Sequence, residues 1–297
     1  MKIAISGGTG YIGGHLKKYF IAKQHEVIVV SRSNQAKGQA GLQLTWEQLA
    51  QDCSALEGLD AFINLSGESV NKLWTNKTKE AILNSRLSTA TQVASIVARL
   101  HNKPKVVING SGMSIYGTSE IKVFDENSPS HVEDFLSSVV EKWEQAIDQI
   151  QGTRVVKLRV GLVISSDGGI LPKMMLPYRF GVGGKVGSGK QWISWIHLED
   201  MIRMIEFCML NDQIQGPVNA TAPHPVTNDE FGRAIGRALH RPHLLPLPGF
   251  LLNLIVGELA SLLLKGQRVI PKVLLDHGFQ FHFSQIDEAM KNIVNNK

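Results

Sequence analysis

Three regularly spaced glycines near the start of the chain restrict its fold more than any other feature. The sequence Gly7-Gly8-Thr9-Gly10-Tyr11-Ile12-Gly13 stands between a short apolar run at residues 3–6 and a segment with helical spacing at residues 11–22. A β-branched run follows at residues 26–30, so the three segments predict a strand, a helix and a second strand. Because strands joined through a helix run parallel, we expect a parallel sheet.

Each glycine of this motif has a physical task. Gly7 permits a tight exit from the strand, Gly10 lets backbone amides approach a pyrophosphate, and Gly13 lets the helix pack close to the sheet. The N-terminus of the helix then faces the anion. The motif therefore predicts a dinucleotide site, with a plain glycine turn as the alternative. The expected contacts are Gly7, Thr9, Gly10, Tyr11, Ile12 and Gly13.

Strands and helices continue to alternate along the chain. Apolar runs predict strands at residues 61–65, 105–109 and 153–163, and helical spacing predicts helices at residues 77–100 and 136–150. This order predicts an α/β protein of the Rossmann type, in which helices cover both faces of a doubly wound parallel sheet.

The pattern changes after Ser165, where glycine-rich segments interrupt the alternation. A further strand is expected at residues 192–198, and helices are expected at residues 200–210, 227–239, 250–264 and 284–293. We therefore expect two parts. Residues 1–165, with about 191–222, would form the dinucleotide-binding domain, and residues 166–190 and 223–297 would form a smaller C-terminal substrate lobe.

The end of the second strand indicates which dinucleotide would bind. An acidic residue there holds the ribose hydroxyls of NAD, but this strand ends in Ser31 and Arg32, and no Asp or Glu occurs from residue 27 to residue 46. Arg32 is suited to pair with a 2′-phosphate. Ser31 and Arg32 therefore favour NADP, with NADPH preferred over NADH, and a solvated surface arginine is the alternative.

Composition excludes several other classes of protein. The 31 basic and 26 acidic residues give a net charge of +5 without a basic patch, so we expect no nucleic-acid partner. Cys53 and Cys208 are too few for a disulfide scaffold and indicate a reducing, cytoplasmic location. We also expect no metal, because no pattern of His, Cys and carboxylate residues completes a metal site.

One leucine-rich segment, residues 244–264, is a candidate membrane segment. Pro, Asn, Gly and Glu interrupt it, so it does not read as a spanning helix. We expect a buried amphipathic helix after Pro248 and no membrane partner, with a docking surface for another molecule as the alternative.

Further stretches of the chain resemble a known family. Besides residues 7–13, these are Asp60-Ala61-Phe62-Ile63-Asn64-Leu65-Ser66-Gly67-Glu68, Asn109-Gly110-Ser111, Trp195-Ile196-His197-Leu198-Glu199-Asp200 and Gly266-Gln267-Arg268-Val269-Ile270-Pro271. With them the chain resembles the extended short-chain dehydrogenases/reductases, and within these the atypical NAD(P)-dependent epimerase/dehydratase-like branch often labelled sugar-nucleotide epimerase, including its C-terminal domain. The resemblance covers essentially the whole chain. It implies a nicotinamide cofactor with further contacts at Leu65, Ser66 and Gly67.

The catalytic pair of the wider family is missing. Its enzymes use a Tyr-x-x-x-Lys pair, in which the lysine lowers the pKa of a tyrosine that exchanges a proton with the substrate. Only Tyr19 has a lysine four residues later, at the far end of the first helix, and the helix at 136–150 holds no tyrosine. We expect Tyr116 to exchange the proton and Ser111 to orient the substrate. A packed tyrosine with a satisfied hydroxyl is the alternative.

Three further cations are candidate ligands. Arg86, on the helix at 77–100, would contact the cofactor or substrate, with a surface ion pair as the alternative. Lys185 and Lys190 lie in a glycine-rich loop that would close over an anionic substrate such as a nucleotide sugar, and a passive mobile loop is the alternative. The loop is not a phosphate loop of a nucleotide triphosphatase, because Gln191 stands where Ser or Thr should bind magnesium.

Together these features predict an NADP-binding oxidoreductase or epimerase. It would transfer a hydride to or from a hydroxyl- or carbonyl-bearing small molecule. An NADP-binding sensor or regulatory protein that has lost catalysis is the alternative function. The sequence leaves open whether the chain is a monomer or a homodimer.

Overall fold

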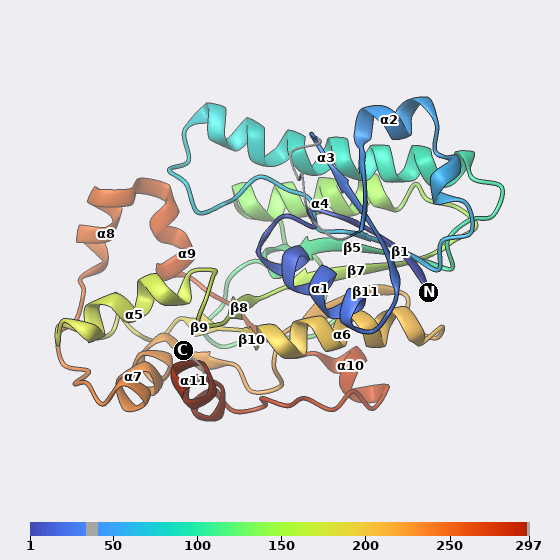
Figure 1. Cartoon of the computed structure of the whole chain (residues 1–297). Helices are drawn as coiled ribbons and strands as arrows, with labels where there is room; N and C mark the ends of the chain where they lie inside the picture. The colour runs from blue at the N-terminus through green and yellow to red at the C-terminus, as the bar shows by residue number, and fades with distance from the viewer. Residues whose placement is uncertain (34–40, 296–297) are drawn as a thin grey trace.

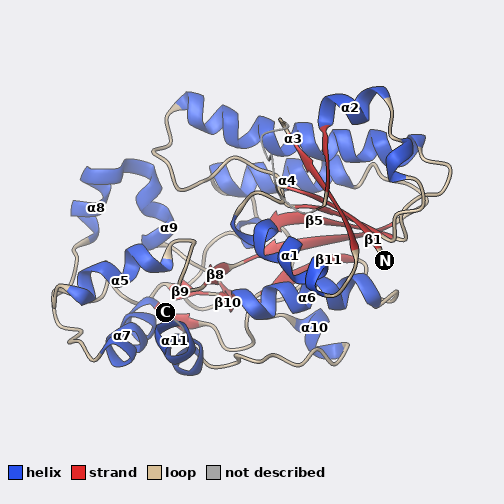
Figure 2. Ribbon diagram, in the orientation of Figure 1, coloured by secondary structure: helices blue, strands red, loops and turns tan. Residues whose placement is uncertain are grey.

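A parallel sheet of seven strands forms the centre of the protein (Figures 1 and 2). The computed structural model describes residues 1–33 and 41–295. The strand order is β11-β7-β5-β4-β1-β2-β3, so the chain reverses its direction of travel across the sheet between β1 and β4. Ligands of open α/β sheets bind at such a reversal, outside the carboxyl ends of the strands. The strands are β1 (Lys2–Ser6), β2 (Glu26–Ser31), β3 (Leu42–Thr45), β4 (Ala61–Asn64), β5 (Val106–Gly112), β7 (Arg154–Val160) and β11 (Gly216–Ala220).

Helices cover both faces of the sheet, as Figure 1 shows. One face packs against α1 (Tyr11–Ala22) and α6 (Leu198–Leu210). The other packs against α2 (Trp46–Gln51), α3 (Asn76–Arg99) and α4 (Phe135–Ile147). This arrangement confirms the expected doubly wound Rossmann-type α/β fold.

Successive residues of each strand point to opposite faces, which makes two apolar cores. In β1, for example, Ile3 and Ile5 belong to the core under α1 and α6, whereas Ala4 belongs to the core under α2, α3 and α4. All three side chains are fully buried. Near-continuous apolar strands are typical of a parallel sheet covered on both faces.

A smaller group of helices lies at one end of the molecule (Figure 1). Its core includes Tyr178, Trp195, Phe231 and Met290. The helices are α5 (Leu171–Arg179), α7 (Asn228–Leu239), α8 (Gly249–Val256), α9 (Ser261–Leu264) and α11 (Ile286–Asn295), with β9 (Trp192–Ile193) paired to β12 (Val226–Thr227). Most of these residues belong to the expected substrate lobe, whose boundaries stay a prediction.

Two short strand pairs join this end of the molecule to the sheet. They are β8 (Leu162–Ile164) with β10 (Trp195–His197), and β6 (Val123–Phe124) with β13 (Arg268–Val269). The helix α10 (Lys272–Asp276) follows β13, and its Leu274 is buried in the same core as Ile3. The remaining elements are the short 3₁₀ helices η1 (Ser54–Leu56), η2 (Met113–Tyr116) and η3 (Gly257–Ala260).

Three sequence predictions about secondary structure are wrong in detail. The strand expected at residues 153–163 is two strands, because at Gly161 the chain leaves β7 and passes so close to Ser194 that a Cβ would lie 2.5 Å from its carbonyl oxygen. The strand expected at 192–198 likewise divides into β9 and β10. The elements β3, β11 and α5 carried no distinct signal in the sequence.

The helix expected at residues 250–264 is the third. It is broken at Gly257, whose φ of 56° is a left-handed conformation that favours glycine. Its first part, α8, is not the buried amphipathic helix that was expected, because Phe250 and Leu254 are 70% and 82% exposed. Among the described residues, the structure contains no helix with the length and apolarity needed to cross a membrane.

Two polar side chains hold the turn between β10 and α6. His197 is the N-cap of α6, and its Nδ1 accepts a hydrogen bond from the backbone N–H of Glu199 at 3.2 Å. Asp200 is fully buried and accepts hydrogen bonds from the backbone N–H groups of His282 and Phe283. Both residues therefore hold the strand-to-helix turn in place.

Candidate functional site

The glycine-rich turn joins β1 to α1 at the edge of the sheet where the strand order reverses. Gly7 has a φ of 74°, and a Cβ there would lie 2.8 Å from the carbonyl oxygen of Leu65. A Cβ at Gly13 would lie 2.3 Å from the carbonyl oxygen of Gly7, and one at Gly10 would lie 3.2 Å from the same atom. The turn can therefore pack this closely only without side chains at these positions.

The N-terminus of α1 is free to accept an anion. Within the described residues no side chain caps this helix, whose N-cap is Gly10, and its first turn holds no acidic residue. Its first backbone N–H groups and its dipole favour a negative charge, as a pyrophosphate would supply. Thr9 is exposed at the tip of the turn, and Ile12 packs against the core. The residues present thus fit a dinucleotide.

Tyr11 joins this turn to the segment after β8. Its hydroxyl is hydrogen-bonded to Ser165, and its ring fills the space beside Gly168, where a Cβ would lie 2.4 Å from the ring. Ser165 in turn donates to Asp167 at 2.7 Å. The side chain of Tyr11 therefore fixes the turn, and its backbone N–H remains available to a ligand.

Arg32 follows the last residue of β2, and its side chain is exposed. The backbone beside it is braced, because the Ser31 hydroxyl donates to the carbonyl oxygen of Ser33 at 2.9 Å. Gln43, on β3, donates to both of these groups at 3.0 and 3.3 Å. Arg32 thus projects from a fixed backbone beside the switch point, where it can meet a ligand without displacing another contact.

The segment after β4 brings Leu65, Ser66 and Gly67 next to the glycine turn. The backbone N–H of Leu65 donates to the carbonyl oxygen of Ser6 at 3.0 Å. Gly67 lies against the guanidinium of Arg86, since a Cβ on Gly67 would be 3.2 Å from Cζ. These residues therefore line one continuous edge with the turn at Gly7.

Arg86 is a cation with an unusual environment. Its Nη1 donates to the carbonyl oxygens of Glu68 and Ile82, both at 3.0 Å, and its guanidinium lies 5.1 Å from the ring centroid of Trp143. Burial lowers its pKa to about 10, although the charge of Glu68 acts in the opposite direction. Among the described residues no carboxylate forms an ion pair with Arg86, so the surface ion pair considered from the sequence is not present. A bound anionic or electron-rich group would stabilise this cation.

Two rows of polar side chains cross the sheet near the carboxyl ends of its strands, on the face covered by α3 and α4. In the first row, the Ser6 hydroxyl donates to Asn64 at 2.5 Å, and Asn64 donates to Asn109 at 2.6 Å. These three residues are register partners on β1, β4 and β5 and are fully buried. Buried polar groups at a strand end need such partners, so the row aligns the loops that follow.

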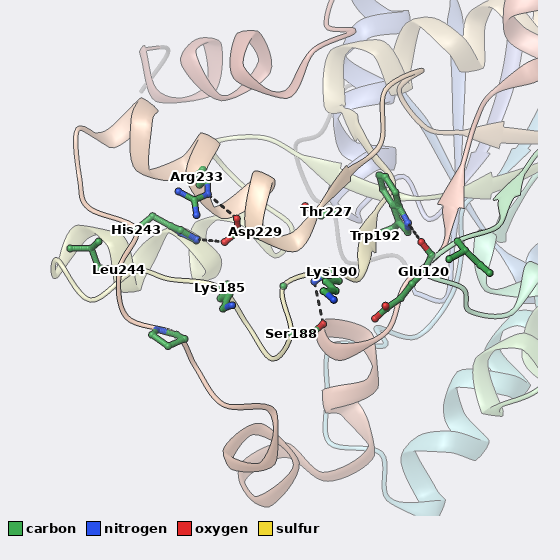
Figure 3. Close-up of a pocket in the computed structure, with 13 residues that line it drawn as sticks. Glu120, Lys185, Ser188, Lys190, Trp192, Thr227, Asp229, Arg233, His243 and Leu244 are labelled. Carbon is green, nitrogen blue, oxygen red and sulfur yellow. Dashed lines mark hydrogen bonds and ion pairs between the residues drawn. The ribbon is translucent and has the colours of Figure 1, made fainter.

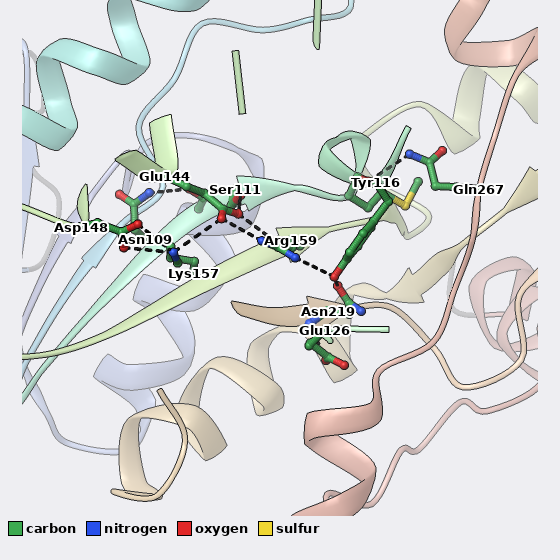
Figure 4. Close-up of polar contacts among 12 residues, drawn as sticks. Asn109, Ser111, Tyr116, Glu126, Glu144, Asp148, Lys157, Arg159, Asn219 and Gln267 are labelled. Atoms are coloured by element: carbon green, nitrogen blue, oxygen red, sulfur yellow. Dashed lines mark hydrogen bonds and ion pairs between the residues drawn. The ribbon is translucent and has the colours of Figure 1, made fainter. Parts of the chain in front are cut away.

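The second row consists of Ser111, Arg159 and Asn219, which are register partners on β5, β7 and β11 (Figure 4). Glu144 reaches this row from α4. Arg159 binds it through two hydrogen bonds of 2.9 Å, and the Ser111 hydroxyl donates to it at 2.6 Å. Burial opposes the ionisation of Glu144, but Arg159, Ser111 and the charge of Lys157 together hold its pKa below the usual range.

Tyr116, at the end of η2, closes this network. Its hydroxyl donates to Asn219 at 2.8 Å and accepts from Arg159 at 2.9 Å, and the side chain is 1% exposed. Burial raises its pKa more than Arg159 and Asn219 lower it. The structure thus places Ser111 and Tyr116 in one network through Glu144 and Arg159. To contact a substrate, the Tyr116 hydroxyl must give up its hydrogen bond to Asn219 or to Arg159.

A cavity of about 640 Å³ lies in the small helical lobe, beside the loop at residues 120–121. Lys185 and Lys190, from the glycine-rich loop, both line it (Figure 3). Within the described residues neither amino group has an ion-pair partner. Trp192, on β9, also lines the cavity, and its indole N–H donates to the carbonyl oxygen of Glu120 at 2.8 Å. Two unpaired cations and an aromatic ring suit an anionic ligand with a flat group.

A chain of hydrogen-bonded side chains forms the far wall of this cavity. His243 contacts the Tyr178 hydroxyl through Nδ1 at 2.8 Å and Asp229 through Nε2 at 3.0 Å, and Arg233 donates to Asp229 at 2.8 Å. The hydrogen bond of Arg233, with a further contribution from His243, lowers the pKa of Asp229. Burial and the charge of Asp229 raise the pKa of Tyr178 to about 12. Gly232 permits this packing, since a Cβ there would lie 2.5 Å from Cε1 of His243 and 2.5 Å from the hydroxyl oxygen of Tyr178.

The glycine-rich loop is held against the small lobe. The carbonyl oxygen of Gly183 accepts from the N–H groups of Leu244 and Leu245, and that of Lys185 accepts from the N–H of Leu247. These backbone hydrogen bonds fix the loop beside residues 244–247. In this structure the loop therefore forms a wall of the cavity.

Comparison with known proteins agrees with this geometry. The sequence profile of the NAD-dependent epimerase/dehydratase family matches residues 3–220. The chain belongs to this family. A second profile, described as a domain of unknown function (DUF1731), matches residues 247–293, the C-terminal part of the chain. The resemblance found in the sequence is thus confirmed over both parts.

Individual members of the family match over nearly all of this chain. An epimerase family protein of Bacillus subtilis, YfhF, is 40% identical over 300 residues, which cover 99% of this chain and 98% of that protein. The crystal structure of the human epimerase family protein SDR39U1 with NADPH has a TM-score of 0.93 and 36% identity, with all of both chains covered. A nucleoside-diphosphate sugar epimerase from Corynebacterium glutamicum has a TM-score of 0.81 and 28% identity, over all of this chain and 59% of that one.

Several residues of the site could not be found from the sequence. Glu144, Arg159 and Asn219 are brought together only by strand register and by the packing of α4. Arg159 carried no distinct signal, because Arg154 and Lys157 are also charged residues of the same run. His243 and Asp229 are 14 residues apart in the chain and gave no recognisable pattern. Among the described residues the structure holds no cluster of three or more His, Cys, Asp or Glu residues suited to a metal.

Proposed function

We propose that this member of the family binds NADP(H) in preference to NAD(H) and transfers a hydride to or from a small molecule with a hydroxyl or carbonyl group. The observation that carries the proposal is Arg32, an exposed cation on a braced backbone at the strand end where NAD-binding chains use an acid. The NADPH in the human relative supports the same choice of nucleotide.

The cavity supports an anionic substrate. Lys185 and Lys190 would bind phosphate or carboxylate oxygens, and Trp192 offers a ring on which a flat group can lie. A nucleotide sugar has both features, and the sugar-nucleotide epimerase relative from C. glutamicum supports this class of substrate. The substrate would enter from the small lobe and meet the cofactor at the ends of β4 and β5.

Ser111 and Tyr116 are the proposed catalytic residues. The nicotinamide, when bound, supplies or accepts the hydride. Because its pKa is raised, Tyr116 keeps its proton at neutral pH and is suited to donate it to a substrate oxygen rather than to remove one. Ser111 would hydrogen-bond the same oxygen in place of Glu144. These assignments favour the reduction of a carbonyl compound.

Two measurements test this function. Fluorescence titration with NADPH and with NADH gives the nucleotide preference, which we expect to favour NADPH. The NADPH complex is then mixed with carbonyl compounds and nucleotide sugars, and the absorbance of the reduced nicotinamide is followed. A variant in which Lys185 and Lys190 are both replaced by Glu should bind NADPH normally and lose turnover. Normal turnover in that variant would show that the cavity does not bind the reacting substrate.

A second candidate function is a sensor that binds NADP(H) without turnover. One observation favours it: the hydroxyls of both proposed catalytic residues are engaged by buried partners, and α4 contains no tyrosine that could replace them. Tight NADPH binding together with no reaction on the whole panel would establish this alternative. The buried free thiols of Cys53 and Cys208 support the further proposal of a reducing, cytoplasmic location.

A further inference from the structure

Two long stretches in the second half of the chain contain no acidic residue. Residues 168–198 carry four cations and no Asp or Glu, and residues 231–257 also contain no Asp or Glu. The first stretch includes α5 and the glycine-rich loop, and the second includes most of α7 and all of α8. Residues 81–119, most of them in α3 and β5, form a longer acid-free stretch, so the absence of carboxylates gains meaning only from what surrounds these two stretches.

The two stretches lie side by side at one end of the molecule (Figure 1). Gly183 accepts hydrogen bonds from Leu244 and Leu245, Val186 forms a bridge with Leu247, and α5 contacts α7. They therefore form one surface. We call it the α5–α8 surface.

Large apolar side chains are concentrated on the α5–α8 surface. The most exposed are Leu254 at 82%, Leu244 at 77%, Phe180 at 74% and Phe250 at 70%. Leu176, Val182, Leu245 and Leu247 are exposed beside them. Exposed single apolar residues are common, but eight of them on two segments that lie side by side indicate an interaction site.

Cations lie among these apolar side chains. Lys173, Arg179 and Arg241 are exposed, and within the described residues none of them has an ion-pair partner. The nearest acidic residue in the sequence after α8, Glu258, is already paired with Lys79 at 2.5 Å. The surface is thus apolar at its centre, positively charged around it, and not neutralised by its own carboxylates.

We propose that the α5–α8 surface binds an anionic lipid bilayer peripherally. Leucine and phenylalanine side chains would enter the interface between headgroups and acyl chains, and Lys173, Arg179 and Arg241 would bind lipid phosphates and carboxylates. Like charges oppose the pairing of this surface with a second copy of itself. Lipid headgroups supply the phosphates and carboxylates that the unpaired cations need, and acyl chains supply the apolar medium that the leucine and phenylalanine side chains need.

This proposal revises one expectation from the sequence. The expectation of no membrane partner rested on the interrupted apolar run at residues 244–264, which excludes a spanning helix. A peripheral surface needs no spanning helix, because exposed side chains on a short helix and its neighbouring loops are enough. The proposal does not depend on the cofactor or on turnover.

Vesicle flotation tests the proposal directly. The full chain is mixed with vesicles of equal amounts of phosphatidylcholine and phosphatidylserine, and with vesicles of phosphatidylcholine alone. We expect binding to the anionic vesicles, loss of that binding in high salt, and much weaker binding to the neutral vesicles. Phe250→Ser should lower the partition coefficient about tenfold, and Lys173→Glu or Arg179→Glu should lower it about fivefold each.

Matched control variants separate this effect from general changes in charge or apolarity. Leu210→Ser removes another apolar side chain, 60% exposed on α6, and Lys142→Glu reverses an exposed charge on α4. Both should bind vesicles as the native protein does, and thermal unfolding should show all variants to be folded.

Three results would overturn the proposal. The first is that the protein floats equally with both kinds of vesicle, or that it floats with neither kind. The second is a dimer in analytical ultracentrifugation that Phe250→Ser dissociates, which would assign the surface to a second copy. The third is binding to polyglutamate without binding to anionic vesicles, which would assign it to an acidic protein.

Discussion

Replacing Arg32 by alanine tests the choice of nucleotide most directly. The side chain is exposed, so its removal costs little folding stability, and the braced backbone of residues 31–33 keeps the site in shape. A hydrogen bond between a charged donor and a phosphate contributes about 1.5–3 kcal/mol. Arg32→Ala should therefore weaken NADPH binding roughly tenfold to 150-fold. It should leave NADH binding nearly unchanged, because NADH has no 2′-phosphate.

The assay is a titration of each variant with NADPH and with NADH, followed by nicotinamide fluorescence at two salt concentrations. Arg32→Lys is the matched control, since it keeps the charge but loses the planar pair of donors, and its loss of affinity should be intermediate. The native preference for NADPH should also shrink at high salt. An unchanged ratio of the two affinities in Arg32→Ala would refute the reasoning.

Three further predictions concern other parts of the site. Gly13→Ala places a Cβ 2.3 Å from the carbonyl oxygen of Gly7 and should abolish NADPH binding in the same titration. Gly14→Ala is the control on the same helix: its Cβ would have one atom within 4 Å, and NADPH binding should be retained. Glu144→Gln leaves Arg159 buried without its counter-charge and should lower the free energy of unfolding by about 3–5 kcal/mol in urea at neutral pH. Because the folded pKa of Glu144 is lowered, its contribution is fully present above the usual glutamate range and is lost as pH falls through the folded pKa, so the two proteins should converge in acid. Tyr116→Phe removes one buried hydroxyl and should cost about 1–3 kcal/mol of stability, abolish turnover and leave the NADPH affinity unchanged; full turnover would exclude it as the proton donor.

The sequence was sufficient to predict those features that depend on local backbone conformation. The turn at Gly7 and Gly13 can exist only without side chains. Together with the apolar run at residues 3–6 and the helical spacing at residues 11–22, this glycine motif predicted β1, the turn and α1 with its observed bounds. The inner strands of the central sheet and β2 were equally visible, because a parallel sheet covered on both faces needs continuous apolar runs, whereas the edge strands β3 and β11 were not.

Features that depend on tertiary contacts were not visible. The break at Gly161 arises from the close approach of Ser194, and neither residue signals it alone. The exposure of Phe250 could not be read from its apolar neighbours, since composition does not say which side of a helix lacks a partner. The network around Glu144 needed the register of β5 with β7, which the sequence does not specify.

For the candidate site residues, too, the sequence indicated the position in the chain but not the contacts of the side chain. The positions of Lys185 and Lys190 beside one cavity agree with their prediction as substrate ligands, and that role stays a prediction until a ligand is identified. Ser111 and Tyr116 were selected for their place after a strand, which does not show the orientation of a hydroxyl. Their partners are therefore new information from the structure.

The C-terminal part of the chain packs into the core of the nucleotide-binding domain. Leu274 and Phe279 lie in the same core as Ile3 and Leu16, and β13 completes a strand pair with β6. All of these C-terminal elements fall within the segment matched by the domain of unknown function. Relatives therefore cannot exchange this segment as an independent module without also changing the stability of the nucleotide-binding half. Evolution of new ligand specificity in such chains is expected to proceed by single substitutions along the cavity wall rather than by recombination of whole domains.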